Sequence, residues 1–235
     1  MSRPSSLHIG MPARKAPAPP KTADEAAKRV RLILRRLNKE YGEVTCALDH
    51  RNAWELLAAT ILSAQCTDKR VNMVTPALFE AYPTPQSIAV AAQPDVEELV
   101  KTTGFFRNKA KSLIGAGKAI TENFGGEVPG EMKDLLTVPG AARKTANVVL
   151  GTWFGKATGV VVDTHVARIS KRLDLTESDD PKKIERDLME ILPKKKWVLF
   201  SHQIIHHGRA VCVARKPRCA KCNLSDLCYA PDRTE

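Results

Sequence analysis

Long apolar runs and strand patterns are both missing from this sequence of 235 residues. No run reaches the length needed to cross a bilayer. Alternation of apolar and polar residues, typical of half-buried strands, occurs only at residues 159–162, a segment too short to build a sheet. These absences argue against a membrane-spanning protein and against a β-rich fold. The apolar pattern that remains has helical spacing, so we expect an all-α protein.

Acidic residues are also scarce. The chain has 37 Lys and Arg against 26 Asp and Glu, a net charge of +11, which indicates a polyanionic partner. No expected helix combines a basic face with an apolar one, as membrane-surface helices do, so nucleic acid is favoured. Residues 1–22 contain five prolines, no acid and no apolar signal core, and we expect a disordered basic tail there. A transit peptide is the alternative, although the prolines would interrupt its amphipathic helix.

Apolar residues recur at helical spacing after residue 22, and we expect two helical domains. Residues 45–156 form one six-helix domain. Residues 23–44 and 157–235 together form the second, because 157–235 alone offer only three amphipathic helices. Thr22 and Asn52 are expected to cap the first two helices. The expected helices cover about 23–41, 53–65, a segment from 68, 85–92, 94–102, 107–124, 131–136, 142–154, 164–173, 181–191 and 196–208.

The segment from Leu135 to Gly151 resembles the helix-hairpin-helix DNA-binding motif. Pro139 cannot continue the preceding helix, and Gly140 can take the positive φ of a sharp turn. The unpaired amides at the start of the next helix, at the positive end of its dipole, can hold a phosphate. The usual core of the motif is Leu-Pro-Gly-Val-Gly, and Ala142 replaces its second glycine here. An ordinary helix-turn-helix corner is the alternative.

The helix after this turn should bury one face, because four apolar residues recur at i, i+3, i+4 and i+7. They are Ala146, Val149, Leu150 and Trp153.

Two residues are candidates for catalysis. Lys144 falls in the first helical turn after the hairpin, where the helix dipole should lower the pKa of its amine and favour a nucleophile. A simple phosphate contact, like that expected of Arg143, is the equal alternative. Asp163 follows the apolar segment 160–162 at the start of a helix, where it would also serve as an N-cap. We expect structural roles for His165, His206 and His207.

Four of the six cysteines are clustered with the spacing C-x6-C-x2-C-x5-C, which points to metal. Four thiolates can surround one Zn²⁺ or one [4Fe–4S] cluster, and the single C-x2-C pair fits the cluster better. Interleaved cations, including Lys216 and Arg218, would suit phosphate contacts. Cys46 and Cys66 stand apart and are expected to be reduced, buried thiols. The clustered residues are Cys212, Cys219, Cys222 and Cys228.

These motifs together resemble the endonuclease III family of helix-hairpin-helix DNA glycosylases. Besides the hairpin lysine, the Val-Asp-Thr-His segment and the cysteine spacing, the segment Leu62-Ser-Ala-Gln-Cys-Thr-Asp68 matches the family's Leu-Ser-Ala-Gln-x-Thr-Asp. His207-Gly-Arg209 precedes the first cysteine as it does in that family. The resemblance covers roughly residues 22–229.

The resemblance implies a bifunctional enzyme of base excision repair. A damaged pyrimidine would be flipped from duplex DNA into a cleft between the domains. Lys144 would attack C1′ of the sugar, Asp163 would assist, and β-elimination from the Schiff base would cut the strand. Gln65 and Phe105 would enter the DNA stack. Gly140, Ala142, Arg143 and Thr145 would contact DNA with Lys216 and Arg218, and the four clustered cysteines would hold a [4Fe–4S] cluster.

The resemblance also implies a monomer of bacterial type that acts in the cytoplasm on the nucleoid. Three other functions compete with the lyase. The related adenine glycosylases lack the catalytic lysine and carry a further domain, and mismatch thymine or uracil glycosylases also usually lack this lysine. A non-catalytic DNA-binding module would use the hairpin and the cluster only as clamps.

Overall fold

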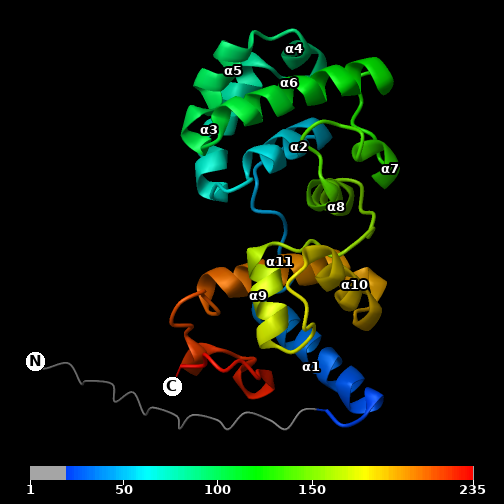
Figure 1. Ribbon diagram of the computed structural model, residues 1–235, viewed down its shortest axis with the longest axis vertical. Helices are drawn as coiled ribbons and strands as arrows, with labels where there is room; N and C mark the ends of the chain where they lie inside the picture. Colours follow the sequence, from blue (N-terminus) through cyan, green and yellow to red (C-terminus); the bar gives the residue numbers. More distant parts are fainter. Residues whose placement is uncertain (1–19, 235) are drawn as a thin grey trace, which may run out of the picture. The chain divides into compact units, whose positions relative to one another are not determined.

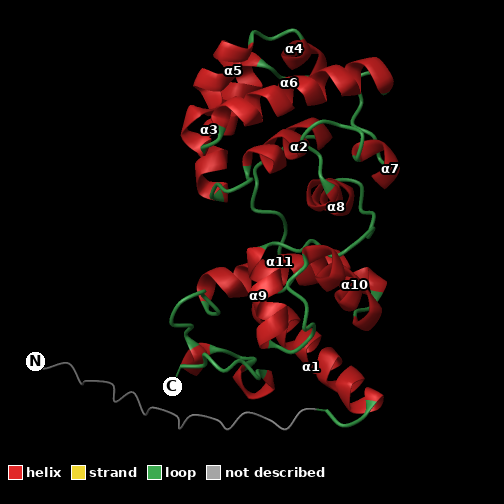
Figure 2. Ribbon diagram, in the orientation of Figure 1, coloured by secondary structure: helices red, strands yellow, loops and turns green. Residues whose placement is uncertain are grey.

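Helices are the only regular secondary structure in the computed structural model, which describes residues 20–234 (Figure 2). This confirms the all-α prediction. No helix among these residues is long and apolar enough to cross a membrane. Most of the expected tail, residues 1–19, lies outside the described range. The α-helices are α1 (Ala23–Tyr41), α2 (Ala53–Leu62), α3 (Asp68–Ala81), α4 (Pro85–Ala89), α5 (Gln93–Val100), α6 (Phe106–Asn123), α7 (Met132–Leu135), α8 (Arg143–Thr152), α9 (Thr164–Arg172), α10 (Pro181–Ile191) and α11 (Trp197–Ala210) (Figure 1).

The described chain divides into two compact units. The hairpin unit consists of residues 44–161 and 193–202, and the cysteine unit consists of residues 20–43, 162–192 and 203–234. The units differ from the expected domains at three places: residue 44 and the segments 157–161 and 193–202 are in the hairpin unit. The domain division itself stays a prediction.

The hairpin unit is built around α2. Asn52 caps this helix by accepting a hydrogen bond from the amide of Glu55, and every residue from Trp54 to Leu62 is buried. A helix that is apolar nearly all round must be surrounded by other elements, and α3, α6 and α8 all contact it. In the same unit, α4 and α5 pack on α6 (Figure 1).

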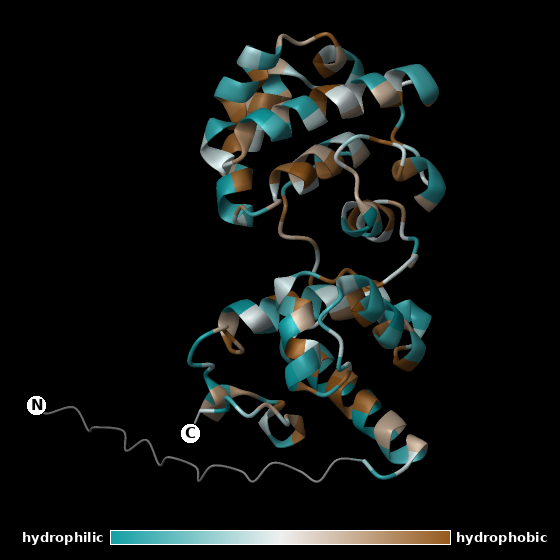
Figure 3. Cartoon of the chain, viewed as in Figure 1, coloured by the Kyte–Doolittle hydropathy of each residue, from teal (hydrophilic) through white to brown (hydrophobic). Residues whose placement is uncertain are grey.

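The cysteine unit begins with α1, capped by the Thr22 hydroxyl, which accepts from the amide of Glu25. Apolar and polar residues alternate around this helix (Figure 3), and its inner face buries Val30, Ile33 and Leu37. The C-terminal half of α1 is tied to the cysteine-rich loop, residues 211–234, because Arg36 pairs through both terminal guanidinium nitrogens with the carboxylate of Asp226. A bidentate pair of this kind fixes orientation as well as distance.

Three local expectations are wrong. Trp153 is 44% exposed, because α8 ends at Thr152 and the indole instead lies edge-on against His50. α2 ends at Leu62 and not near 65, since Ser63–Cys66 already form a turn, with the Cys66 amide donating to the Ser63 carbonyl. Cys46 and Cys66 are reduced thiols but only half-buried, packed at the margin of the core.

Candidate functional site

The turn at Pro139–Gly140 is built into the core of the hairpin unit. Gly140 has φ +82°, and a Cβ atom there would lie 3.0 Å from Ser112 Cβ and 3.1 Å from Ile61 Cδ1. Glycine is therefore required twice, by the backbone conformation and by the close approach of α2 and α6. The exposed surface of the turn continues into the first residues of α8.

Lys144 is exposed on the first turn of α8, next to exposed Arg143. Ala142 is the N-cap residue, and its methyl side chain makes no capping hydrogen bond. The N-cap side chain therefore offers the first turn of α8 no acceptor, and the start of a helix is a favourable place for an anion. Thr145 turns inward and is 9% exposed. The structure thus places an exposed amine at the start of α8, and its part in catalysis stays a prediction.

Gln65 and Phe105 share an uncommon backbone conformation in the hairpin unit. Their φ angles are +51° and +48°, in the left-handed region that is costly for residues with a Cβ atom. Both side chains are exposed, Phe105 to 65%. An exposed phenylalanine on a strained backbone is typical of a residue with a task outside its own core.

Lys109 supports the loop that carries Phe105. Its side chain is only 4% exposed, and Nζ donates to the carbonyl oxygen of Thr103 over 2.7 Å. Burial lowers the pKa of this ammonium. The sequence analysis did not single out Lys109, although a lysine three residues after Phe106 and next to Ala110, on the inward face of α6, is a visible signal.

Asp163 is the N-cap of α9 in the cysteine unit. Its Oδ1 accepts from the amides of His165 and Val166, each over 2.8 Å. Neither hydrogen bond uses Oδ2, and the side chain is half-buried. The helix cap therefore fixes the orientation of the carboxylate through Oδ1 and does not use Oδ2.

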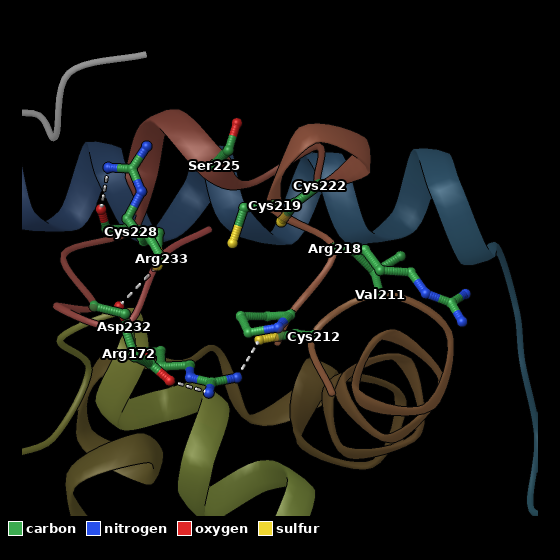
Figure 4. A pocket seen from close by; sticks show the side chains of 12 residues that line it. Arg172, Val211, Cys212, Arg218, Cys219, Cys222, Ser225, Cys228, Asp232 and Arg233 are labelled. Carbon is green, nitrogen blue, oxygen red and sulfur yellow. Dashed lines mark hydrogen bonds and ion pairs between the residues drawn. The ribbon is translucent and has the colours of Figure 1, made fainter. Parts of the chain in front are cut away.

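Four thiols line one pocket in the cysteine unit. Figure 4 shows their side chains coming to this pocket from different parts of the loop, with Arg172 of α9 directed at Cys212. All are reduced. Among the described residues, no three His, Cys, Asp or Glu side chains are arranged to hold a single metal ion. The thiols are Cys212, Cys219, Cys222 and Cys228.

Spaced thiols around a common pocket fit a polynuclear iron–sulfur cluster better than one zinc ion, whose ligands converge tightly. Burial raises the pKa of the Cys222 thiol to about 12 and raises that of Cys228 as well. Thiolates at these positions therefore require positive charge close by, and iron bound to the sulfurs supplies it. The residues present thus fit the group.

Arg172 joins both ends of the cysteine-rich loop to α9. Its guanidinium donates to Cys212 Sγ over 3.2 Å and to the carbonyl of Val213 over 2.8 Å, and it pairs with Asp232. Its own carbonyl accepts from the amide of Tyr229. The sequence analysis missed Arg172, yet it lies three residues after buried Ile169, on the apolar face of α9.

A buried histidine lies behind Cys222. His207 is 2% exposed; its Nε2 is 3.5 Å from Cys222 Sγ and its Nδ1 is 2.9 Å from the Tyr41 hydroxyl. Burial lowers the pKa of His207 to about 4 and raises the pKa of Tyr41 to about 12. Both groups are therefore neutral near pH 7.

The loop carries exposed cations on its outer side. Lys216 is exposed with φ +53°. Arg218 is also exposed but donates from its guanidinium to the carbonyl of Ala210 over 3.2 Å. Lys216 is therefore the better residue of the two for testing a phosphate contact.

Family models match two segments of this chain. Residues 58–194 match the HhH-GPD superfamily base excision DNA repair protein, and residues 212–228 match the iron–sulfur binding domain of endonuclease III. The second match begins and ends on the first and last of the four clustered cysteines. The chain therefore belongs to the HhH-GPD superfamily of base excision repair proteins.

Curated relatives show to which family within this superfamily the chain belongs. Endonuclease III of Synechocystis is 56% identical over 204 residues, which cover 87% of this chain and 92% of the relative. Endonuclease III of Escherichia coli is 37% identical over 209 residues, which cover 89% and 98%. The chain is a member of the endonuclease III family: a DNA glycosylase with abasic-site lyase activity that carries a [4Fe–4S] cluster.

Solved structures agree with this membership. A trapped endonuclease III–DNA covalent intermediate matches with a TM-score of 0.82 and 40% identity, over 86% of this chain and 95% of that one. A thermostable thymine-DNA glycosylase matches with a TM-score of 0.78 at 22% identity, over 87% and 97%, a likeness of fold alone. The prediction of the family from the sequence is confirmed.

Proposed function

We propose that this enzyme removes oxidised pyrimidines from duplex DNA and cuts the strand at the resulting abasic site, with Lys144 as the nucleophile. The observation that carries the proposal is the exposed amine on the first turn of α8, directly after the hairpin. The hairpin amides would bind the phosphate next to the damaged nucleotide and so bring its sugar to the lysine.

The chemistry proposed for Lys144 proceeds in two stages. The neutral amine forms a bond to C1′ of the sugar, the bond between C1′ and the base breaks, and the base leaves with the electron pair and takes up a proton. Ring opening then gives a Schiff base between Nζ and C1′. Loss of a C2′ proton expels the 3′ phosphate by β-elimination, and water releases the lysine.

Asp163 would serve this reaction with the oxygen that the helix cap does not use. Its carboxylate would accept a proton from the amine and stabilise the cationic sugar as the base departs. Held by two amides of α9, it is fixed in direction before substrate arrives.

The remaining candidate residues would hold the DNA. Gly140, Ala142 and Arg143 are exposed at the start of α8, and Lys216 and Arg218 add cations from the loop. The side chain of Thr145 is buried, so this residue would contact DNA through its backbone amide alone. Gln65 and Phe105 would fill the space that the flipped nucleotide leaves and so lower the cost of unstacking.

The four clustered cysteines would hold the cluster, which supplies structure: it ties together a loop with little apolar core of its own. We propose further that the enzyme acts as a monomer in the bacterial cytoplasm, at the chromosome. The endonuclease III relatives matched here come from bacteria.

Borohydride trapping tests the nucleophile. Reduction of the Schiff base should link the wild-type enzyme covalently to an abasic duplex, and Lys144→Gln should form no adduct and cut neither that duplex nor one with thymine glycol. Glutamine is an acceptable helix former, so folding and DNA binding should be retained. Lys111→Gln, an exposed lysine on α6, is the matched control and should react normally. An adduct with Lys144→Gln would place the nucleophile elsewhere.

A further inference from the structure

A hydrogen-bonded chain connects helix α1 with the cysteine-rich loop inside the cysteine unit. The Tyr41 hydroxyl lies 2.9 Å from Nδ1 of His207, and Nε2 of the same ring lies 3.5 Å from Cys222 Sγ. The two rings meet edge to face, with centroids 5.9 Å apart at 76°. His207 is 2% exposed, so water does not replace either partner.

The chemistry of the partners determines where each proton lies. A thiolate bound to iron only accepts hydrogen bonds, so Nε2 must carry the proton that faces Cys222. In a neutral imidazole Nδ1 is then an acceptor, and the Tyr41 hydroxyl is the donor to it. Tyr41 thus fixes the tautomer of His207, and the tautomer decides whether the sulfur faces an N–H or a lone pair.

Cys222 differs from the other three cysteines in this respect. Cys212 receives a charged guanidinium N–H from Arg172, and Cys219 receives the backbone amide of Thr234 over 3.4 Å. Cys228 receives the backbone amide of Ala230, and Cys222 receives that of Leu224 in addition to its contact with His207. The sulfur of Cys222 faces a ring nitrogen of His207, and the other ring nitrogen is in turn held by the Tyr41 hydroxyl.

We propose that Tyr41 and His207 form a relay that raises the reduction potential of the cluster, with His207 donating to the Cys222 thiolate and Tyr41 acting through His207 as a positioning residue. The inference rests on the proposed role of Cys222 as a ligand and goes beyond the structural role expected for His207. It assigns to α1 a part in tuning the cofactor.

The direction of the effect follows from charge. One-electron reduction adds a negative charge to the cluster, part of which resides on the thiolate sulfurs. An N–H donor stabilises the reduced form more than the oxidised form, and hydrogen bonds to the sulfurs are among the factors that set these potentials. Removing the donor should therefore make the cluster harder to reduce.

Three variants test the relay in the intact, cluster-loaded protein. Tyr41→Phe removes the hydroxyl and keeps the ring, His207→Leu removes the donor, and the double variant removes both, so that no polar partner is left buried alone. Protein-film voltammetry gives the midpoint potential, with the electrode as electron source. The midpoint does not depend on how many molecules carry the cluster, so partial loss of iron does not spoil the reading.

We expect His207→Leu to lower the midpoint potential, by a shift on the order of tenfold in the ratio of reduced to oxidised cluster at fixed potential, which is 59 mV for a one-electron couple. Tyr41→Phe should shift it in the same direction. In the His207→Leu background the Tyr41→Phe change should have no further effect, because Tyr41 acts through the histidine.

Tyr82→Phe, which removes a tyrosine hydroxyl in the hairpin unit, is the control and should leave the potential unchanged. The midpoint potential of Tyr41→Phe equal to that of the wild type would overturn the relay and leave both residues as packing. Additive shifts in the double variant would overturn the role of Tyr41 through His207. Wild-type protein without iron would instead contradict the cofactor assignment, a separate failure read from its iron content.

Discussion

Asp163 uses one carboxylate for two purposes, and a single substitution separates them. Asp163→Asn keeps an oxygen that can cap α9, because Asn and Asp are equally good N-caps. It removes the negative charge that would stabilise a cationic sugar. We expect base release from a thymine glycol duplex to slow by roughly a hundredfold or more, while cleavage of a preformed abasic site slows less, since its aldehyde is already electrophilic.

Asp180→Asn is the matched control for this prediction. Asp180 caps α10 in the same way, accepting from the amide of Lys183 over 2.9 Å, and lies in the same unit. Both variants should unfold at nearly the wild-type temperature, and only Asp163→Asn should lose activity. Equal, small losses in the two variants would reduce Asp163 to a helix cap.

At the residue scale, a sequence can point to those residues whose own side chain carries the chemistry. The side-chain type and the spacing in the sequence are enough to select Lys144, Asp163 and the four clustered cysteines as candidates. Their roles stay predictions. Arg172 and Tyr41 were not found, because their meaning lies in partners far along the chain: Tyr41 meets His207 across 166 positions. The residues next to Tyr41 and Arg172 in the sequence do not indicate which distant residues these side chains contact.

At the scale of the element, the hairpin turn depends on a glycine that meets two separate demands. Gly140→Ala places a methyl group in left-handed backbone and against Ser112 and Ile61, so we expect a loss of roughly 2–4 kcal/mol in the free energy of unfolding. Gly125→Ala has the backbone cost alone, since φ is +61° and nothing lies within 4 Å, and should lose about 1 kcal/mol.

Denaturant unfolding followed by tryptophan fluorescence measures the two losses. The hairpin variant should also bind DNA more weakly, because the start of α8 moves with the turn, while Gly125→Ala binds normally. Equal losses of stability in the two variants would show that the contacts with Ser112 and Ile61 yield at no cost.

Helix starts were better predicted than helix ends. Thr22 and Asn52 cap the helices expected of them, because a cap is a local hydrogen bond that its own residue type supplies. No glycine or proline follows Leu62 directly, so the sequence gives no local signal for the end of α2. The ring contact of Trp153 with His50 joins two segments that no helical periodicity connects.

At the scale of the whole molecule, the net charge of +11 predicts DNA affinity that falls steeply with salt. Lys216→Ala should weaken binding to all sequences alike and reduce the slope of log K against log salt by about 1. Lys28→Ala is the control, because that lysine is already paired with Asp24 at 2.6 Å in α1. Titrations at several salt concentrations measure the slope, and an unchanged slope for Lys216→Ala would remove the loop from the phosphate contacts.

Loss of the cluster should affect the two units differently. Purified protein should be yellow-brown, with broad absorbance near roughly 400 nm, and removing iron by oxidation and chelation should unfold the segment 212–228 first. Limited proteolysis with mass spectrometry should then cut in this segment and in α1, whose Arg36 loses its partner Asp226, while the hairpin unit stays resistant. Colourless, active protein with one zinc ion would contradict the prediction.

The order of the segments along the chain determines when each unit can fold during synthesis. The cysteine unit starts with α1 and is completed by segments that are synthesised much later. Arg36 can pair with Asp226 only after a further 190 residues have been added to the chain. The apolar face of α1 therefore leaves the ribosome with nothing to cover it, while the hairpin unit can fold from segments nearly adjacent in the chain. Contacts so distant in sequence form slowly, and an exposed apolar helix is prone to association in the meantime. The native contacts of α1 are thus complete only when the cysteine-rich loop has been made.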